Sequence, residues 1–251
     1  MKSWLKFLMP GFLKRANHER NIAREARRNA GRTSQDVFSE IYREKKWGGT
    51  GAFCSGSGSA IEAITDPYVA CIRGYLRAAG SERPRVVDLG CGDFAIGSRL
   101  VEDCAEYIGV DVVPDLVKHL QETVSGPVRF VCLDMAHDDL PAGDVCLIRQ
   151  VFQHLSNAQI QNVLTKLSQY RTVFITEHHP ANNLAVTPNV DKVQGSGIRL
   201  FNNSGVYLDH PPFNVPAANL ELILEVPDHG FGKLYNPGVI RTFQLTFPKA
   251  G

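Results

Sequence analysis

Short apolar runs bounded by charged or polar residues alternate with stretches of helical periodicity from residue 85 to residue 177. Such runs are typical of buried parallel strands, because helices cover both faces of a parallel sheet. Two further strand-like runs follow near the C-terminal end, with Pro- and Gly-containing segments around them. The predicted strands span residues 85–89, 107–111, 128–135, 144–149, 172–177, 220–226 and 239–247.

Apolar residues at helical spacing predict helices before and between these strands. Ser34 is suited to cap the first helix, whose apolar positions recur every three to four residues. Ser156 and Gln159 have the spacing of a capping box, which predicts a helix over 157–170. Strands that alternate with helices in this way indicate an α/β fold on a mostly parallel sheet. The other predicted helices span residues 60–79 and the segment that begins at residue 98.

The turn after the first predicted strand carries the clearest chemical signal. Gly90 and Gly92 follow the strand, and glycines let backbone N–H groups approach a bound nucleotide because no Cβ intervenes. The segment Gly90 to Ala95 also fits a loose G-x-G-x-x-A dinucleotide fingerprint. Asp88 argues against that interpretation, because a carboxylate here would repel a pyrophosphate over the turn. It suits a ligand with a cationic amino-acid end instead.

The stretch Asp88-Leu-Gly90-Cys-Gly92-Asp-Phe94 resembles the first motif of the class I S-adenosylmethionine (SAM) dependent methyltransferases, acid-x-Gly-x-Gly-x-Gly. Phe94 replaces the last glycine of that motif. The resemblance covers residues 85–177 and is to members that modify small molecules or saccharides. It implies a three-layer Rossmann-like α/β sandwich with a seven-stranded, mostly parallel sheet and an N-terminal helical lid. The last strand of that sheet is antiparallel and lies beside the fifth, which agrees with the predicted terminal hairpin.

The resemblance assigns cofactor contacts to acidic residues at the ends of three successive strands. Asp88 faces the amino-acid end of SAM, Asp111 accepts from the ribose hydroxyls, and Asp134 accepts from the exocyclic amine of adenine. A carboxylate at a strand end is well placed to accept from both ribose hydroxyls. The remaining residues predicted to bind the cofactor are Gly90, Cys91, Gly92, Val112, Met135, Arg149 and Trp47.

Three residues are candidates for the catalytic side of the site. His154 lies in the predicted loop after the fourth strand, either as a base or hydrogen-bonding group for the methyl acceptor or as a residue that holds its loop. Glu177 and His178 end the fifth strand, and either is a second candidate base. Together with His179 they could also bind a metal. Neighbouring residues of a strand point to opposite faces, however, so no metal site is predicted.

Charge is unevenly distributed along the chain, although the formal net charge is only +1. Residues 1–32 carry a charge of +7, so the remainder is acidic, which argues against a nucleic-acid partner. Residues 1–15 have the composition of a short helix in a membrane interface, or of a helix that docks on the protein itself. No run of eighteen apolar residues predicts a transmembrane helix. The six cysteines form no C-x-x-C pair and are expected to be reduced, as in a cytoplasmic protein that is free or peripheral to the inner face of a membrane.

These patterns divide the chain into three parts. A basic amphipathic segment spans 1–32, a helical lid with a Gly/Ser-rich loop spans 33–80, and a SAM-binding domain spans 81–251. The loop that follows Trp47 is either a lid over cofactor and substrate or a solvent-exposed linker. An insertion over 181–219 is rich in Asn, Asp, Arg and Tyr, which suit a hydroxyl-bearing or zwitterionic acceptor.

The first functional hypothesis is O-methylation of a small-molecule or saccharide hydroxyl, with SAM as the methyl donor. The second is N-methylation of a protein or amine, to which the acidic part of the chain would attract a cation. The third is a non-catalytic SAM-fold module, to which the loss of the glycine at Phe94 gives weight. The intact acidic residues at the strand ends favour an enzyme, and the sequence carries no signal for an oligomeric state.

Overall fold

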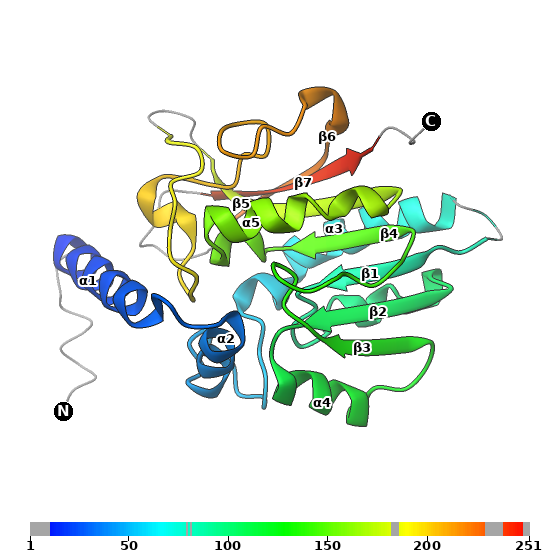
Figure 1. Ribbon diagram of the computed structural model, residues 1–251, viewed down its shortest axis with the longest axis horizontal. Coiled ribbons are helices and arrows are strands. Elements are labelled where there is room, and N and C mark those ends of the chain that lie inside the picture. Colours follow the sequence, from blue (N-terminus) through cyan, green and yellow to red (C-terminus); the bar gives the residue numbers. More distant parts are fainter. Residues whose placement is uncertain (1–10, 79, 81, 182–185, 229–237, 248–251) are drawn as a thin grey trace.

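The computed structural model describes residues 11–78, 80, 82–181, 186–228 and 238–247. At its centre lies a seven-stranded sheet in the order β3-β2-β1-β4-β5-β7-β6 (Figure 1). Only β7 runs antiparallel within the described chain, paired between β5 and β6, so the predicted Rossmann-like topology is confirmed. The strands are β1 (Arg85–Leu89), β2 (Glu106–Asp111), β3 (Val128–Cys132), β4 (Val145–Arg149), β5 (Thr172–Pro180), β6 (Leu220–Pro227) and β7 (Gly238–Thr246).

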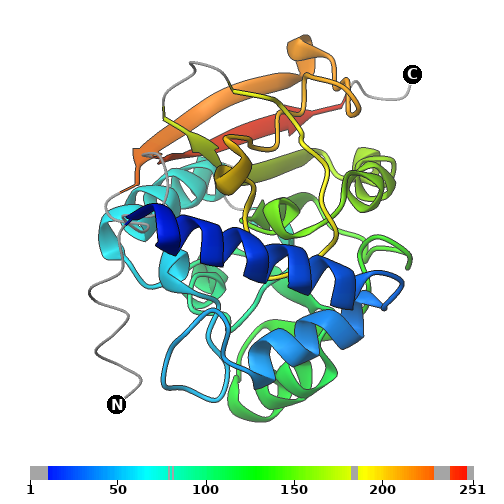
Figure 2. The same cartoon turned by 90° about the vertical axis from the view of Figure 1, so that its left-hand side faces the viewer.

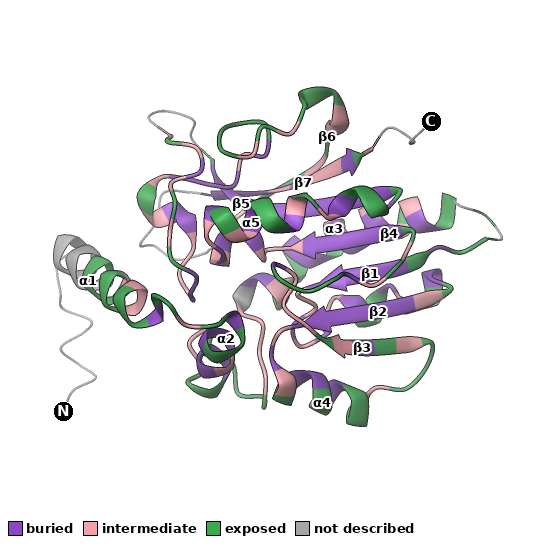
Figure 3. Cartoon of the chain, viewed as in Figure 1, coloured by how far each residue is buried: buried purple, intermediate pink, exposed green. Residues whose placement is uncertain are grey.

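Helices cover both faces of the sheet and make the outer two layers. α3 (Glu62–Ala78) lies on one face, and α5 (Asn157–Leu164) lies on the other (Figures 1 and 2). α4 (Pro114–Thr123) packs on β2 and β3. The four central strands are almost wholly buried, as Figure 3 shows, because their Val, Ile, Leu and Phe side chains meet helices on both sides. The sheet is therefore a rigid base for whatever its strand ends carry.

The connection after β1 differs from the prediction of a helix beginning at Ser98. It forms two 3₁₀ turns, Gly97–Arg99 and Val101–Asp103. The connection contacts α3: the buried Asp103 carboxylate accepts from Arg73 of α3 at 3.0 Å and from Arg77 of α3 at 2.7 Å. These tertiary contacts override the local helical pattern.

Other elements differ from prediction at their ends. β5 is three residues longer than predicted, because β7 pairs with it as far as the Pro180–Gly238 register. Thr33 rather than Ser34 caps α2 (Ser34–Arg43), with its hydroxyl accepting from the N–H of Asp36 at 3.1 Å. The predicted helix over 157–170 ends at Leu164 and continues as a short 3₁₀ turn. Its capping box is formed as predicted.

The N-terminal part of the described chain is helical. α1 (Gly11–Asn29) lies across α2 and the insertion, beyond the carboxyl ends of the parallel strands (Figure 2). Asn29 donates to the carbonyl of Gln194 at 3.0 Å, and Glu25 accepts from the Ser196 hydroxyl at 2.8 Å. Much of the predicted interfacial helix over 1–15 falls outside the described residues. In the part of the chain that is described, no helix is long and apolar enough to cross a membrane.

The insertion after β5 is ordered by its own polar side chains where it is described. The buried Asn189 amide donates to the carbonyls of Tyr207 and Pro211, and its oxygen accepts from the Tyr207 N–H at 2.8 Å. Asp191 accepts from the N–H of Asn157 at 2.8 Å and so anchors the insertion to the start of α5. Many of the polar residues that suggested an acceptor site therefore fold the insertion itself.

Candidate active site

A cavity of about 630 Å³ lies at the carboxyl ends of the parallel strands, on the side where α1 and α2 lie (Figure 1). Its wall combines residues from the ends of β1, β2 and β4 with residues from the lid, from α1 and from the insertion. Ligands of open α/β sheets bind at this edge, because the loops after the strands open there. The volume falls in the range of ordinary small-molecule sites.

The turn after β1 forms the floor of this cavity. Gly90 and Gly92 adopt φ angles of +81° and +56°, which residues with a Cβ rarely adopt. A Cβ on Gly90 would lie 2.5 Å from the Val151 side chain, and one on Gly92 would lie 2.2 Å from the Ser55 hydroxyl. Both glycines are thus required by conformation and by close packing against the loop after β4 and against the lid.

Phe94, which replaces the third glycine of the motif, has a structural explanation. It adopts a φ of +63°, so the turn keeps the left-handed conformation that the motif glycine would supply. The left-handed region costs a residue with a Cβ about 1–2 kcal/mol. The Phe94 ring is 4% exposed and packs edge-on against Tyr107 and Phe130, with ring centroids 5.5 and 5.0 Å away. Burial of an aromatic ring contributes about 1.5–3 kcal/mol, which offsets the conformational cost.

The three acidic strand-end residues line this one cavity. Asp88 is buried and accepts from the Tyr107 hydroxyl at 2.7 Å, while Asp111 accepts from the N–H groups of Gly92 and Val113 at 3.1 Å each. Burial raises the pKa of Asp88 and of Asp111 to about 6 in each case. Asp134 lies nearer the surface and contacts the His137 ring at 3.0 Å.

The Gly/Ser-rich lid is held onto this floor at two points. The Ser55 N–H donates to Asp93 at 2.9 Å, and the Asp93 N–H donates to the Ser55 hydroxyl at 2.7 Å. Arg149 donates to the carbonyl of Gly58 at 2.8 Å and lies 5.1 Å over the ring centre of Tyr68. These contacts hold the segment against the turn, and its residues 55, 56, 58 and 59 line the cavity.

Comparison with known proteins agrees with this geometry. Residues 86–171 match a family model described as a methyltransferase domain. The fold is similar to that of the N-methyltransferase NodS from Bradyrhizobium japonicum, solved with S-adenosylhomocysteine (SAH), at 12% identity and a TM-score of 0.53, covering 82% of this chain and 98% of that chain. It is similar to the 1,6-didemethyltoxoflavin-N1-methyltransferase from Burkholderia thailandensis at 16% identity and a TM-score of 0.52, covering 84% and 86%. A search of curated proteins finds no match to this chain.

The matched residues run from β1 to the residue before β5. They therefore include the glycine turn and all three acidic strand-end residues. Residues 86–171 therefore form a methyltransferase domain. The solved structures, at these low identities, support the methyltransferase fold and leave the acceptor open.

The other residues predicted to contact the cofactor also lie on this cavity. Cys91, Val112 and Met135 line it beside the acidic residues. Trp47 lies on the opposite side, where its indole N–H donates to the Ser196 carbonyl at 3.3 Å. Its ring packs against His154, with ring centroids 5.1 Å apart, so the lid meets the loop after β4 at this point.

His154 lines the cavity as a neutral ring. Its Nδ1 lies 3.2 Å from the Gly195 carbonyl oxygen, an arrangement in which Nδ1 carries the proton and donates. Burial lowers the pKa of His154 to about 3, and the nearby Lys192 ammonium acts in the same direction. The Nε2 atom, 3.4 Å from the Gln153 amide nitrogen, is then the acceptor atom of the ring. Because Nε2 has one lone pair, a ligand that donates to His154 displaces the Gln153 amide, and the ring is a weak base.

Glu177 holds the loop after β4 rather than facing the cavity. Its carboxylate accepts from the consecutive N–H groups of residues 151, 152 and 153 at 3.1, 2.8 and 3.0 Å. The side chain is buried and is absent from the cavity wall. Burial raises the pKa of Glu177, whereas the three N–H donors and Arg199 act in the opposite direction and favour the carboxylate. The predicted pair of Glu177 and His178 is thus separated by the strand, with only His178 on the cavity.

His178 and His179 point to opposite sides of β5, as expected for neighbours in a strand. His178 lines the cavity, and its Nε2 lies 3.3 Å from Asp228, while burial lowers the pKa of His178. His179 places its Nε2 2.9 Å from the Val206 carbonyl oxygen. Among the residues that the structure describes, no three His, Cys, Asp or Glu side chains gather in a way that could hold a metal ion.

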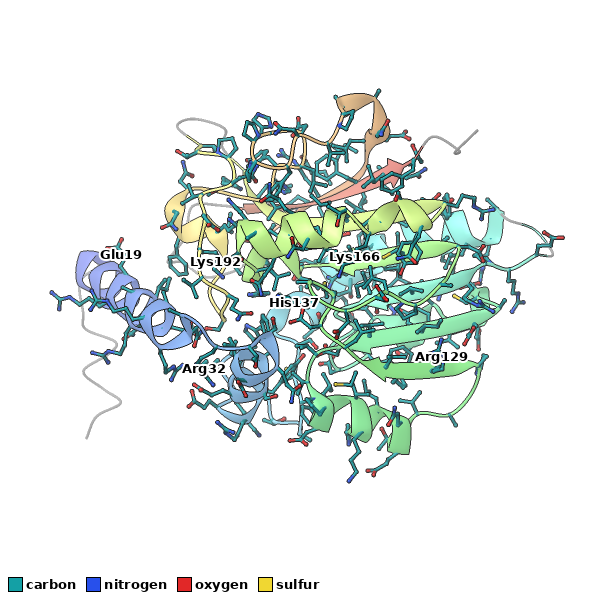
Figure 4. The ribbon with its side chains drawn as sticks, viewed as in Figure 1. Glu19, Arg32, Arg129, His137, Lys166 and Lys192 are labelled. Carbon is teal, nitrogen blue, oxygen red and sulfur yellow. The ribbon has the colours of Figure 1, made fainter. Side chains whose placement is uncertain are left out.

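Two cations, the half-buried Lys192 and the buried Arg199, join the insertion to the loop after β4. Lys192, labelled in Figure 4, donates to the carbonyls of Gly197 and Gln153 at 2.6 and 3.3 Å. Burial lowers the pKa of Lys192 to about 7, and the neighbouring Arg199 acts in the same direction. Arg199 donates to the Leu155 carbonyl at 2.8 Å. The stretch 195–198, of which residues 196–198 line the cavity, is therefore held against the loop after β4.

Sequence patterns missed much of the acceptor side of the site. α1 contributes cavity residues that were assigned only to a basic segment, and the insertion contributes small and apolar residues rather than its polar ones. The contacts that bring α1 and the insertion together join residues more than 160 positions apart. No local pattern carries that information. The cavity residues missed in this way are Asn21, Ile22, Arg24, Glu25, Arg28, Ser196, Gly197, Ile198 and Phe201.

Proposed function

We propose that SAM binds in the 630 Å³ cavity with its methionine end over the glycine turn, its ribose at Asp111 and its adenine beside Asp134 and Met135. The observation that carries this proposal is convergence: the turn and carboxylates from three separate strands line one cavity. Asp88 and Asp111, with pKa values of about 6, are ionised at neutral pH. Asp88 then attracts the ammonium group of SAM, and Arg149 supplies a cation for its carboxylate.

We propose that methyl transfer proceeds in line from the sulfonium to an acceptor held below α1. The methyl group on a sulfonium is already activated, so positioning supplies much of the rate. His154 Nε2 accepts a hydrogen bond from the attacking O–H or N–H in place of the Gln153 amide, and so orients the lone pair of the attacking atom. Glu177 acts through the loop by holding residues 151–153 in place, and His178 is the second polar group on the acceptor side.

The acceptor that this site favours is a ring-bearing small molecule with an acidic hydroxyl, such as a phenol. The aromatic and apolar side chains of Phe38, Trp47, Ile198 and Phe201 line the acceptor side. A His154 with a pKa of about 3 is too weak a base for an aliphatic saccharide hydroxyl. The second candidate is N-methylation of a small amine, because a neutral amine needs no deprotonation before transfer. Closure of the cavity by α1 and the insertion favours small molecules over proteins.

Binding of SAH measured by calorimetry tests the cofactor site. Asp111→Ala should weaken SAH by about 10- to 100-fold, because hydrogen bonds to a charged group contribute about 1.5–3 kcal/mol. Asp139→Ala, which removes an exposed carboxylate beyond β3, is the matched control and should change nothing. Wild-type protein that fails to bind SAH would refute the site. Methyl-labelled SAM offered with phenols, amines and saccharides then separates the acceptor classes.

A further inference from the structure

α1 presents a polar edge to the acceptor side of the cavity. Asn21, Arg24 and Arg28 follow one another at intervals of three and four residues, which places them along one side of a helix, and all three line the cavity. The adjacent side of the helix is used for docking: Glu25 binds Ser196, and Asn29 binds the Gln194 carbonyl. The helix is thus fixed with its donor-bearing edge toward the ligand.

The charges around this edge are balanced, with one exception. Arg28 and Arg32 pair with Glu40 at 2.8 and 2.7 Å. Lys46 pairs with Glu25 at 3.1 Å and with Glu44 at 3.3 Å. Three cations thus meet three carboxylates. Arg24, the remaining cation of this part of the cavity wall, has no ion pair among the described residues.

The same cavity is also walled by apolar and aromatic groups. Phe38, Trp47, Ile198 and Phe201 line it, and Trp47 packs against Tyr42 with ring centroids 5.2 Å apart. An uncharged apolar ligand would leave the guanidinium without a counter-charge at the edge of this wall. A ligand with an aromatic body and an anionic substituent satisfies both the wall and the cation.

We propose that the acceptor is an aromatic or otherwise apolar small molecule that carries an anionic group, and that Arg24 binds this group at the cavity mouth. Arg24 is then a specificity-determining residue, remote from the transferred methyl group. This inference rests on the proposed function, because it places the acceptor between α1 and the SAM site. The anionic group is a carboxylate, sulfonate or phosphate, which a guanidinium binds through the same paired N–H donors.

The test uses the dye 1-anilinonaphthalene-8-sulfonate, which combines an aromatic body with an anion, and the full-length protein saturated with SAH. A Trp4→Phe background leaves Trp47 as the single tryptophan, so energy transfer from Trp47 reports dye bound at this site. Arg24→Gln should weaken the dye by about tenfold. Arg27→Gln, which removes an exposed charge from the same helix, is the matched control and should leave its affinity unchanged. The uncharged dye N-phenyl-1-naphthylamine should bind both variants and the parent equally.

Two results would overturn the inference: equal affinity of the sulfonate dye for Arg24→Gln and its parent, or no transfer from Trp47 in the SAH complex. An equal loss of affinity for both dyes in Arg24→Gln would also overturn it, because that result indicates a change of shape rather than of charge. SAH affinity, measured on the same samples, separates this outcome from failure of the proposed function. Protein that binds SAH but is indifferent to Arg24→Gln refutes only the anion site, whereas protein that does not bind SAH refutes the cofactor site.

Discussion

The left-handed conformation of Phe94 predicts an inverted order of stability for two substitutions. Phe94→Ala removes a ring that is 4% exposed and should cost about 3–5 kcal/mol. Phe94→Gly removes the same ring but relieves the left-handed backbone, which is worth about 1–2 kcal/mol at a φ of +63°. The greater freedom of glycine in the unfolded chain offsets about 0.5–1 kcal/mol of the stability gained by relieving the left-handed backbone. The glycine variant should therefore be the more stable of the two by about 1 kcal/mol.

Urea unfolding followed by circular dichroism measures this difference. The matched control is Ala95→Gly at the next position, where the backbone is not left-handed, and there glycine should be less stable by about 0.5–1 kcal/mol. A Phe94→Ala variant at least as stable as Phe94→Gly would refute the conformational argument. Loss of less than 1 kcal/mol in both variants would show that the ring does not anchor the turn.

Three further predictions concern buried charges. Glu177→Gln places an NH₂ group among three N–H donors, so one donor loses its acceptor, which should lower stability by about 1–3 kcal/mol. We expect kcat to fall at least about tenfold while the SAH dissociation constant stays within about twofold. An unchanged kcat would contradict the positioning role of Glu177. SAH affinity should be constant above neutral pH and fall below about pH 6, because Asp88 and Asp111 take up protons there; calorimetry across pH measures this. Without ligand, the raised pKa values of the same two groups mean that the free energy of unfolding increases as pH falls through about 6, which thermal unfolding across pH measures. Asp103→Asn should lower stability by about 1–2 kcal/mol at pH 7, because Arg73 and Arg77 lower the pKa of Asp103; the value is modest because Arg77 is largely exposed and screened by solvent. The difference in stability from wild type should disappear as pH falls below the ordinary aspartate range. A difference that does not change with pH would indicate a packing effect instead.

The cofactor half of the site was accessible to sequence reasoning because its signals are local. Asp88, Asp111 and Asp134 each end an apolar run, and parallel strands bring such ends to one edge of a sheet. The capping box at Ser156 likewise lies within four residues. The sequence predicted that these acidic residues lie close together. It did not predict the conformation of Phe94, because the Phe94 ring packs on Phe130 from another strand.

The acceptor half resisted prediction because its residues are close only in space. Polar residues of the insertion suggested a polar acceptor, but Asn189 and Arg199 bind backbone carbonyls instead. Glu177 looked like a catalytic base at a strand end, and the structure places its carboxylate on three backbone N–H groups. Composition does not distinguish a side chain that folds its own segment from one that faces a ligand.

The sequence by itself determined the order of the predicted strands and helices, the glycine turn and the acidic residues at the strand ends. Periodicity and strand-end chemistry depend on a few neighbouring residues, so they can be read along the chain. Only the tertiary structure decided that α1 closes the cavity, that His154 is a half-buried ring on its wall with a lowered pKa, and that Arg24 has no ion pair among the described residues. These properties depend on burial and on partners far along the chain, and both exist only once the chain is folded.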